Sequence, residues 1–183
     1  VIRTISSSPN RSLNPKPQKL SEARHLWNKA AKLLIAERAW LPTYRVFSVY
    51  CSDKVLSNVW WPIDIEEESA KILSLWLNST YGLLLFFTAA EVTRGPWIKF
   101  KKAALEDLLV LDVRKLNENQ KGFLLNAFKQ FCGKELKPLP EEFKHPSTRL
   151  QIDETFNQAL GISADLEYLY KLLSVVCASN SKV

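Results

Sequence analysis

Hydrophobic residues recur with a helical period near the start of the chain and with a strand period soon after. Apolar side chains every three or four positions from Ser21 onward predict an amphipathic helix that Pro42 ends. Residues 44–50 alternate and are rich in β-branched and aromatic side chains, which predicts a strand. Residues 57–62 predict a second, shorter strand. The first third of the chain therefore predicts one helix followed by two strands.

An acidic helix start and several short elements occupy the middle of the chain. Asp64, with Glu67 three residues later, marks a helix that we expect to end at Gly82. Residues 83–87 are apolar throughout, so their spacing does not distinguish a continued helix from a buried strand. The pattern then predicts a strand, a short helix and another strand, at residues 97–101, 103–108 and 109–113.

Capping patterns mark three helices in the last third. Asn117 and Gln120 match a capping box before a helix that Gly133 closes. Two more helices follow a Pro-containing connector, the first stopped by Gly161 and the second capped by Ser163. Taken together, these elements predict a mixed α/β fold. It would consist of a small mixed sheet packed with helices, followed by a C-terminal helical tail. We expect an arm, an α/β domain and a connector with helical segment, at residues 1–20, 21–135 and 136–183.

The charge of the chain is basic and unevenly distributed. The 183 residues carry a formal net charge of +6, and residues 1–50 hold nine Lys and Arg against two acids. A grouped positive charge favours an anionic partner. The three cysteines form no CxxC pair, so we expect buried or half-buried free thiols and a cytoplasmic setting. The longest apolar run is too short to span a bilayer. Because the chain begins at Val1 and contains no Met, we interpret it as a piece of a longer polypeptide.

Signals of catalysis are scarce in this sequence. The two histidines, His25 and His145, stand outside any metal or nucleophile spacing, and five scattered glycines form no phosphate-binding loop. We therefore expect no catalytic residue, no metal and no cofactor in this segment.

The most informative stretch runs from Arg94 to Lys102. If residues 97–101 form a strand, Ile98 and Phe100 face the core while the intervening side chains face outward. An exposed indole beside ammonium groups is suited to phosphates and bases, although a solvated strand face with a half-buried Trp has the same pattern. The outward set is Trp97, Lys99 and Lys101.

Other residues supply a second candidate surface and a pair of adjacent indoles. The first predicted helix would carry Arg24, Lys29 and Lys32 on one face, with Arg38 and Arg45 nearby in sequence; a hydrated helix face is the simpler alternative. Trp60 and Trp61 must point to opposite sides of a strand, so we expect one in the core and the other exposed or covered by a neighbour.

Three segments, taken in order, resemble a known family: SNVWWP, LWLNSTYG and TRGPWIKFKK, at residues 57–62, 75–82 and 93–102. A short helix with the sequence LEDL then leads into VLD. This order is similar to the region that follows the catalytic domain in N6-adenine-specific DNA methyltransferases of type I and fused type II restriction-modification systems. The tail, residues 149–161 and 165–173, is similar to the helical end of such proteins.

The resemblance implies a target-recognition domain that selects a sequence in double-stranded DNA and does not itself methylate. It implies an upstream catalytic methyltransferase domain in the same polypeptide, which would use S-adenosylmethionine. The expected DNA-binding residues are Arg94, Trp97, Lys99, Lys101 and Lys102, assisted by Arg45 and Asn58. An alternative is a protein-docking domain that holds another subunit through Trp-rich and Leu-rich surfaces. A third hypothesis, an enzyme in its own right, has little in the sequence to support it.

Overall fold

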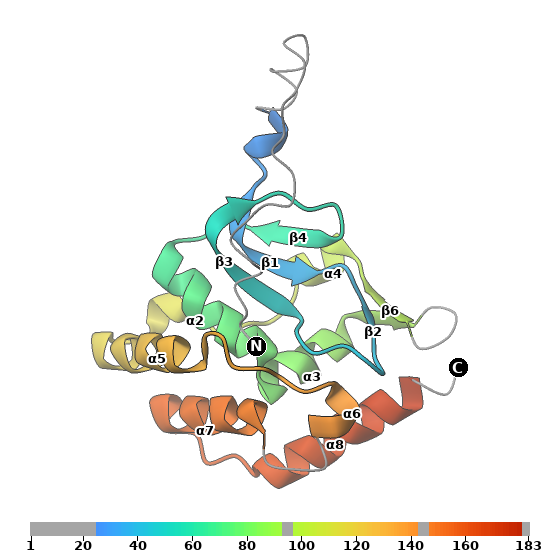
Figure 1. The fold of residues 1–183 in the computed structure, drawn as a ribbon. Coiled ribbons are helices and arrows are strands. Elements are labelled where there is room, and N and C mark those ends of the chain that lie inside the picture. The colour runs from blue at the N-terminus through green and yellow to red at the C-terminus, as the bar shows by residue number, and fades with distance from the viewer. Residues whose placement is uncertain (1–24, 93–96, 143–146, 181–183) are drawn as a thin grey trace.

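The computed structural model describes residues 25–92, 97–142 and 147–180, and it confirms a mixed α/β fold (Figure 1). Its strands form two small antiparallel sheets, ordered β3-β1-β4 and β2-β6-β5. Among the described helices, none alone is long and apolar enough to cross a membrane; α2 and α3 together meet those criteria, but they bend by 76° at their junction.

The first sheet is built around β1 (Ala31–Ala36), which pairs with β3 (Ser48–Val55) and β4 (Trp60–Ile63). The predicted helix from Ser21 to Pro42 is therefore wrong where it overlaps these strands; only residues 25–27 of the described part are helical. Every residue of β1 except one is buried, because both strand edges and both faces are covered. A central strand of this kind lacks the alternation that marks a half-exposed strand.

The second sheet consists of β2 (Arg38–Trp40), β6 (Trp97–Phe100) and β5 (Ala90–Val92). Residue Glu37 alone separates β1 from β2, and its carbonyl accepts a hydrogen bond of 2.8 Å from the Phe100 amide. The chain thus passes directly from one sheet to the other, which keeps β4 and β6 close together.

Two consecutive helices, α2 (Glu67–Asn78) and α3 (Thr80–Thr88), cover the sheets. The side chain of Glu66, rather than Asp64, caps α2. Gly82 does not end a helix as predicted; it lies in the first turn of α3, where a Cβ would come within 2.2 Å of the Trp76 carbonyl oxygen. The segment 83–87, left open by its sequence, is helical.

After β6 the chain forms α4 (Lys102–Glu106), a 3-10 turn (Val113–Lys115) and α5 (Glu118–Phe131). The predicted strand at 109–113 is wrong: this segment pairs with no described strand, and Leu109 is 77% exposed. Alternating apolar residues need a neighbouring strand edge to form a sheet. The capping box at the start of α5 is confirmed in both of its hydrogen bonds.

The C-terminal helices are α6 (Leu139–Glu142), α7 (Thr148–Leu160) and α8 (Leu166–Asn180). Gly161 ends α7 in the left-handed conformation, as predicted, with φ of 63°. The first turn of α8 is capped by Asp165 and not by Ser163, because the Tyr168 amide donates to the Asp165 carboxylate at 3.0 Å.

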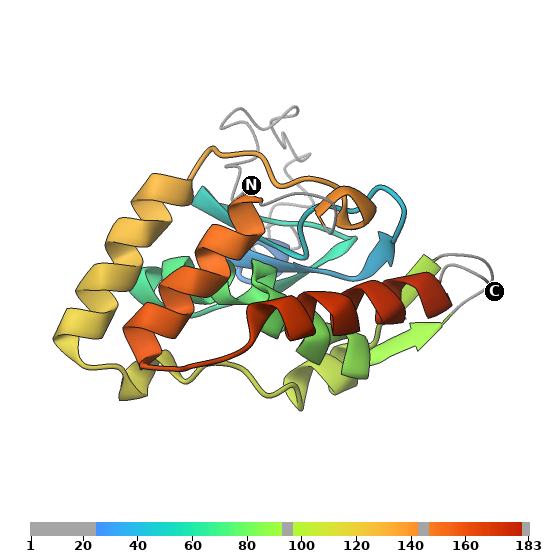
Figure 2. The ribbon, with the colours of Figure 1, turned by 90° about the horizontal axis from the view of Figure 1, so that it is seen from below.

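The helical tail shares its hydrophobic core with the sheets. Figure 2 shows α5 and α7 side by side, with α8 running away from α7 to contact α3 and α6. Side chains from the tail belong to the same buried cluster as β1, α2 and β6; they are Leu136, Leu139, Ile152, Phe156, Leu173 and Cys177. The tail therefore packs against α2 and α3 and contributes side chains to the core beneath the sheets.

Candidate nucleic-acid interface

The outer face of the second sheet carries the predicted basic strand. Ile98 and Phe100 are fully buried, whereas Trp97 and Lys99 are exposed, so the predicted alternation is confirmed. Lys101, at the next outward position, is exposed as well. One side of β6 therefore faces the core and the other presents an indole and two ammonium groups.

Strand β2 adds two residues that were not among the predicted site residues. Arg38 lies directly opposite Lys99, and Trp40 lies opposite Trp97, so all four side chains share one face. The Trp40 and Trp97 rings meet edge to face with centroids 5.1 Å apart. We call this surface the basic face, defined by Arg38, Trp40, Trp97, Lys99 and Lys101.

Two carboxylates partly neutralise the basic face. Glu37 accepts from Arg38 at 3.2 Å and lies 3.9 Å from the Lys99 ammonium, while Glu91 lies 2.6 Å from the Lys101 ammonium. Three cations against two acids leave a local charge of +1. The Lys101–Glu91 pair is exposed at both partners and contributes little, about 0–1 kcal/mol, whereas the Glu37 carboxylate shared by Arg38 and Lys99 is only 15% exposed. A phosphate can therefore displace Glu91 from Lys101, and the half-exposed Arg38 and Lys99 side chains can contact phosphate beside Glu37.

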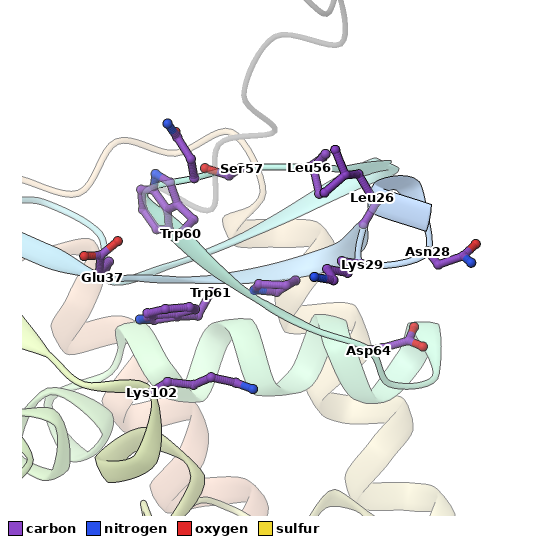
Figure 3. A pocket seen from close by; sticks show the side chains of 13 residues that line it. Leu26, Asn28, Lys29, Glu37, Leu56, Ser57, Trp60, Trp61, Asp64 and Lys102 are labelled. Carbon is purple, nitrogen blue, oxygen red and sulfur yellow. The ribbon is translucent and has the colours of Figure 1, made fainter. Parts of the chain in front are cut away.

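Lys102 and Asn58 lie beside a groove next to the basic face, rather than on the face itself (Figure 3). The groove has a volume of about 930 Å³ and follows β4, which is one of the two edge strands of the first sheet among the described strands. Lys102 leaves the start of α4 and pairs with Glu106 at 3.2 Å. The other polar side chains at the groove are Asn28, Lys29, Glu37, Ser57 and Asp64.

Both adjacent tryptophans line the groove, and neither is fully buried. Trp60 packs on the small cluster of Leu34, Val49 and Cys51, on one side of the first sheet. Trp61 turns the other way, and its indole N–H donates to the Phe100 carbonyl oxygen at 3.4 Å. The expected opposite orientation is confirmed, but the expected contrast of one core and one exposed ring is wrong, because both rings are half-buried.

Two predicted residues stand apart from this assembly. Arg45 pairs with the Glu135 carboxylate, and its backbone carbonyl accepts from Arg149, so it is held toward the helical tail. None of its described contacts reaches the basic face. Arg94 lies outside the described residues.

The second candidate surface, on the first predicted helix, does not form as one face. Lys32 belongs to β1 and pairs with Glu67 at 2.5 Å, whereas Lys29 lies at the groove. Arg24 is outside the described residues. A basic helix face requires a helix through residue 32, and that segment is a strand.

The carboxylate with the most strongly altered titration belongs to the tail. Burial raises the pKa of Asp153 to about 7, although hydrogen bonds from the Thr80 amide and hydroxyl and the nearby Arg149 guanidinium act in the opposite direction. Perturbed carboxyls often mark active sites. Here both oxygens are bonded to Thr80 and the residue does not line the groove, so its contacts are those of a structural tie.

The three cysteines are free thiols, two buried and one half-buried, as expected. Within the described ranges, no three His, Cys, Asp or Glu side chains converge in a way that would hold a metal ion. Comparison of the chain with known protein families, with curated proteins and with solved structures finds no match.

Proposed function

We propose that this chain is the DNA-recognition domain of an adenine-specific DNA methyltransferase of the restriction-modification type. Methyl transfer from S-adenosylmethionine would take place on a separate catalytic domain of the same polypeptide, in the cytoplasm. The proposal rests on the ordered sequence resemblance and on the basic face, which supplies the chemistry that a DNA-binding surface needs.

One observation carries the proposal: β2 and β6 place two indoles and three cations on a single exposed sheet face. Arginine and lysine side chains bind phosphate oxygens, and indole rings stack on bases or sugars. The opposite face of β6 is fully buried, so these side chains cannot turn inward. The surface is therefore held in place by the core beneath it.

The number of cations sets the expected salt dependence. If Arg38, Lys99 and Lys101 each neutralise one phosphate, the slope of log affinity against log salt concentration should be about −2.7, at about −0.9 per phosphate. The measurement is fluorescence anisotropy with a labelled duplex of mixed sequence, between about 50 and 200 mM salt.

The decisive variant is the double substitution Lys99→Ala and Lys101→Ala. It should weaken binding and flatten the slope to about −0.9, because one phosphate contact remains. Lys129→Ala, which removes an exposed lysine from α5, is the matched control and should change neither quantity. Unchanged affinity and slope in the double variant would rule out the basic face as the DNA surface.

A stripe on α8 favours the alternative, a protein-docking domain. Tyr168, Leu172 and Val175 lie at helical spacing and are all exposed, while Leu173 and Cys177 of the same helix are buried. Under this alternative, DNA binding is weak and independent of salt, and the chain forms a stable complex with the catalytic methyltransferase chain. Leu172→Glu with Val175→Glu should then dissociate that complex, whereas the recognition function predicts that these changes leave DNA affinity intact.

A further inference from the structure

The groove along β4 has the size of a small-molecule site. Its volume of about 930 Å³ lies within the range of small-molecule pockets, about 300–1,000 Å³. The outer edge of β4 bounds it, with residues 26–30 on one side and Lys102 on the other (Figure 3).

The two indoles of the groove are fixed rather than loose. Trp61 is oriented by its N–H bond to the Phe100 carbonyl, which belongs to the buried side of β6. Trp60 is held by the apolar cluster beneath the first sheet. Rigid, half-exposed aromatic rings are suited to stacking, because little side-chain freedom is lost when a planar ligand binds.

The polar groups around these rings are mixed and balanced in charge. Glu37 and Asp64 accept hydrogen bonds, Lys29 and Lys102 donate them, and the Asn58 amide can do both. Two cations against two acids leave no net charge, which does not suit a bare polyanion. A nucleobase presents donors and acceptors together on the edge of a planar ring, and this set complements it.

The groove and the basic face are continuous. Glu37 lines the groove and also pairs with Arg38 and Lys99 of the basic face, and Lys102 directly follows Lys101 in the chain. A nucleic-acid strand whose phosphates lie on the basic face would bring its neighbouring nucleotide to the mouth of the groove.

We propose that the groove between Trp60, Trp61 and Lys102 receives one unpaired, unstacked nucleobase of a nucleic-acid strand held on the basic face. This inference rests on the proposed DNA-binding function and adds a base-sized site to it. Trp61 would stack on the base, Asn58 and the two carboxylates would contact its edge, and Lys102 would contact the adjoining phosphate.

The test compares two labelled duplexes that differ by a single unpaired cytosine bulge. The protein should bind the bulged duplex about fivefold to a hundredfold more tightly, the range expected for stacking one base on an aromatic side chain. Trp61→Leu should abolish this preference and leave binding to the intact duplex unchanged, and Asn58→Ala should reduce the preference severalfold. Asn126→Ala, an exposed amide on α5, is the matched control.

The outcomes separate the two proposals. Equal binding of bulged and intact duplexes, with the Lys99 and Lys101 double variant still weakening both, overturns the base site and leaves the DNA-binding function standing. Binding of neither duplex overturns both. Asn58 is exposed, so its variant keeps the test valid even if Trp61→Leu fails to fold, which thermal unfolding monitored by circular dichroism would reveal.

Discussion

The basic face and the junction between the core and the helical tail use similar side chains in opposite ways. At the tail junction, which we define as Asn78, Thr80, Arg149 and Asp153, the charged and polar groups are fully buried. On the basic face, the cations are exposed and share two carboxylates.

The two regions differ in which groups can replace the partner of a charged side chain when a contact breaks. The Arg149 guanidinium donates to the carbonyls of Asn78 and Arg45, and both oxygens of Asp153 accept from Thr80. Breaking any of these hydrogen bonds leaves a buried polar group without a partner and without access to water. An exposed lysine that loses its carboxylate regains water or a phosphate at little cost. A buried charged side chain therefore contributes to the stability of the fold, whereas an exposed one remains free to bind a ligand.

The largest expected effect comes from Arg149→Met. This change keeps the side-chain volume but leaves two carbonyls and the Asp153 carboxyl without their cation, so unfolding free energy should fall by about 3–5 kcal/mol. Urea denaturation measures the loss. The matched control is Arg114→Met, at an 88% exposed arginine, which should cost less than about 1 kcal/mol. Equal losses for the two arginines would contradict the comparison.

The next effect is a pH dependence that the tail junction should impose on stability. The folded pKa of Asp153 is about 7, above its unfolded value of 3.8, so the folded state binds more protons between those pH values. Stability from this group is therefore complete below about pH 4 and is lost as pH rises through 7, by up to about 4 kcal/mol.

Asp153→Asn should remove that dependence, because an amide does not titrate and can still accept from the Thr80 amide. The measurement is the urea midpoint of both proteins from about pH 5 to pH 8. A wild-type protein whose stability rises over this interval, or a variant with the same slope as the wild type, would show that burial does not control this carboxyl.

The smallest expected effect tests whether the pairs on the basic face are exchangeable. Glu91→Gln removes the carboxylate that competes with phosphate for Lys101, so DNA affinity at low salt should increase severalfold. The free energy of unfolding should change by less than about 0.5 kcal/mol. Weaker DNA binding, or a large loss of stability, would mean that this pair belongs to the fold and not to the binding surface.

Local patterns predicted those elements whose signal lies within a few residues. The alternation from Trp97 to Phe100 and the capping box at Asn117 are each confirmed, because side-chain direction in a strand and the first turn of a helix are local properties. The central strand β1 was missed because its neighbours cover every side, which removes any contrast between apolar and polar positions.

The rest of the candidate site could not be predicted for a related reason. Arg38 and Trp40 join the basic face only because β2 pairs with β6, about sixty residues later in the chain. The groove brings Glu37, Trp61 and Lys102 together through the pairing of β4 with β1 and the passage of the chain between sheets. Arg45 was expected to assist DNA binding, but a glutamate ninety residues later in the chain pairs with it at the helical tail. Contacts between distant segments do not affect the local periodicity of the sequence, so periodicity cannot predict them.

The absence of a side chain at Gly82 permits the first turn of α3 to approach the end of α2 closely. A methyl group there would collide with the Trp76 carbonyl and the Leu77 backbone, so even alanine would require the backbone of the α2–α3 junction to shift. Strand β5, which pairs with β6 of the basic face, follows α3 after a single residue. A change at this buried junction therefore acts on the helix that leads into the sheet carrying the basic face.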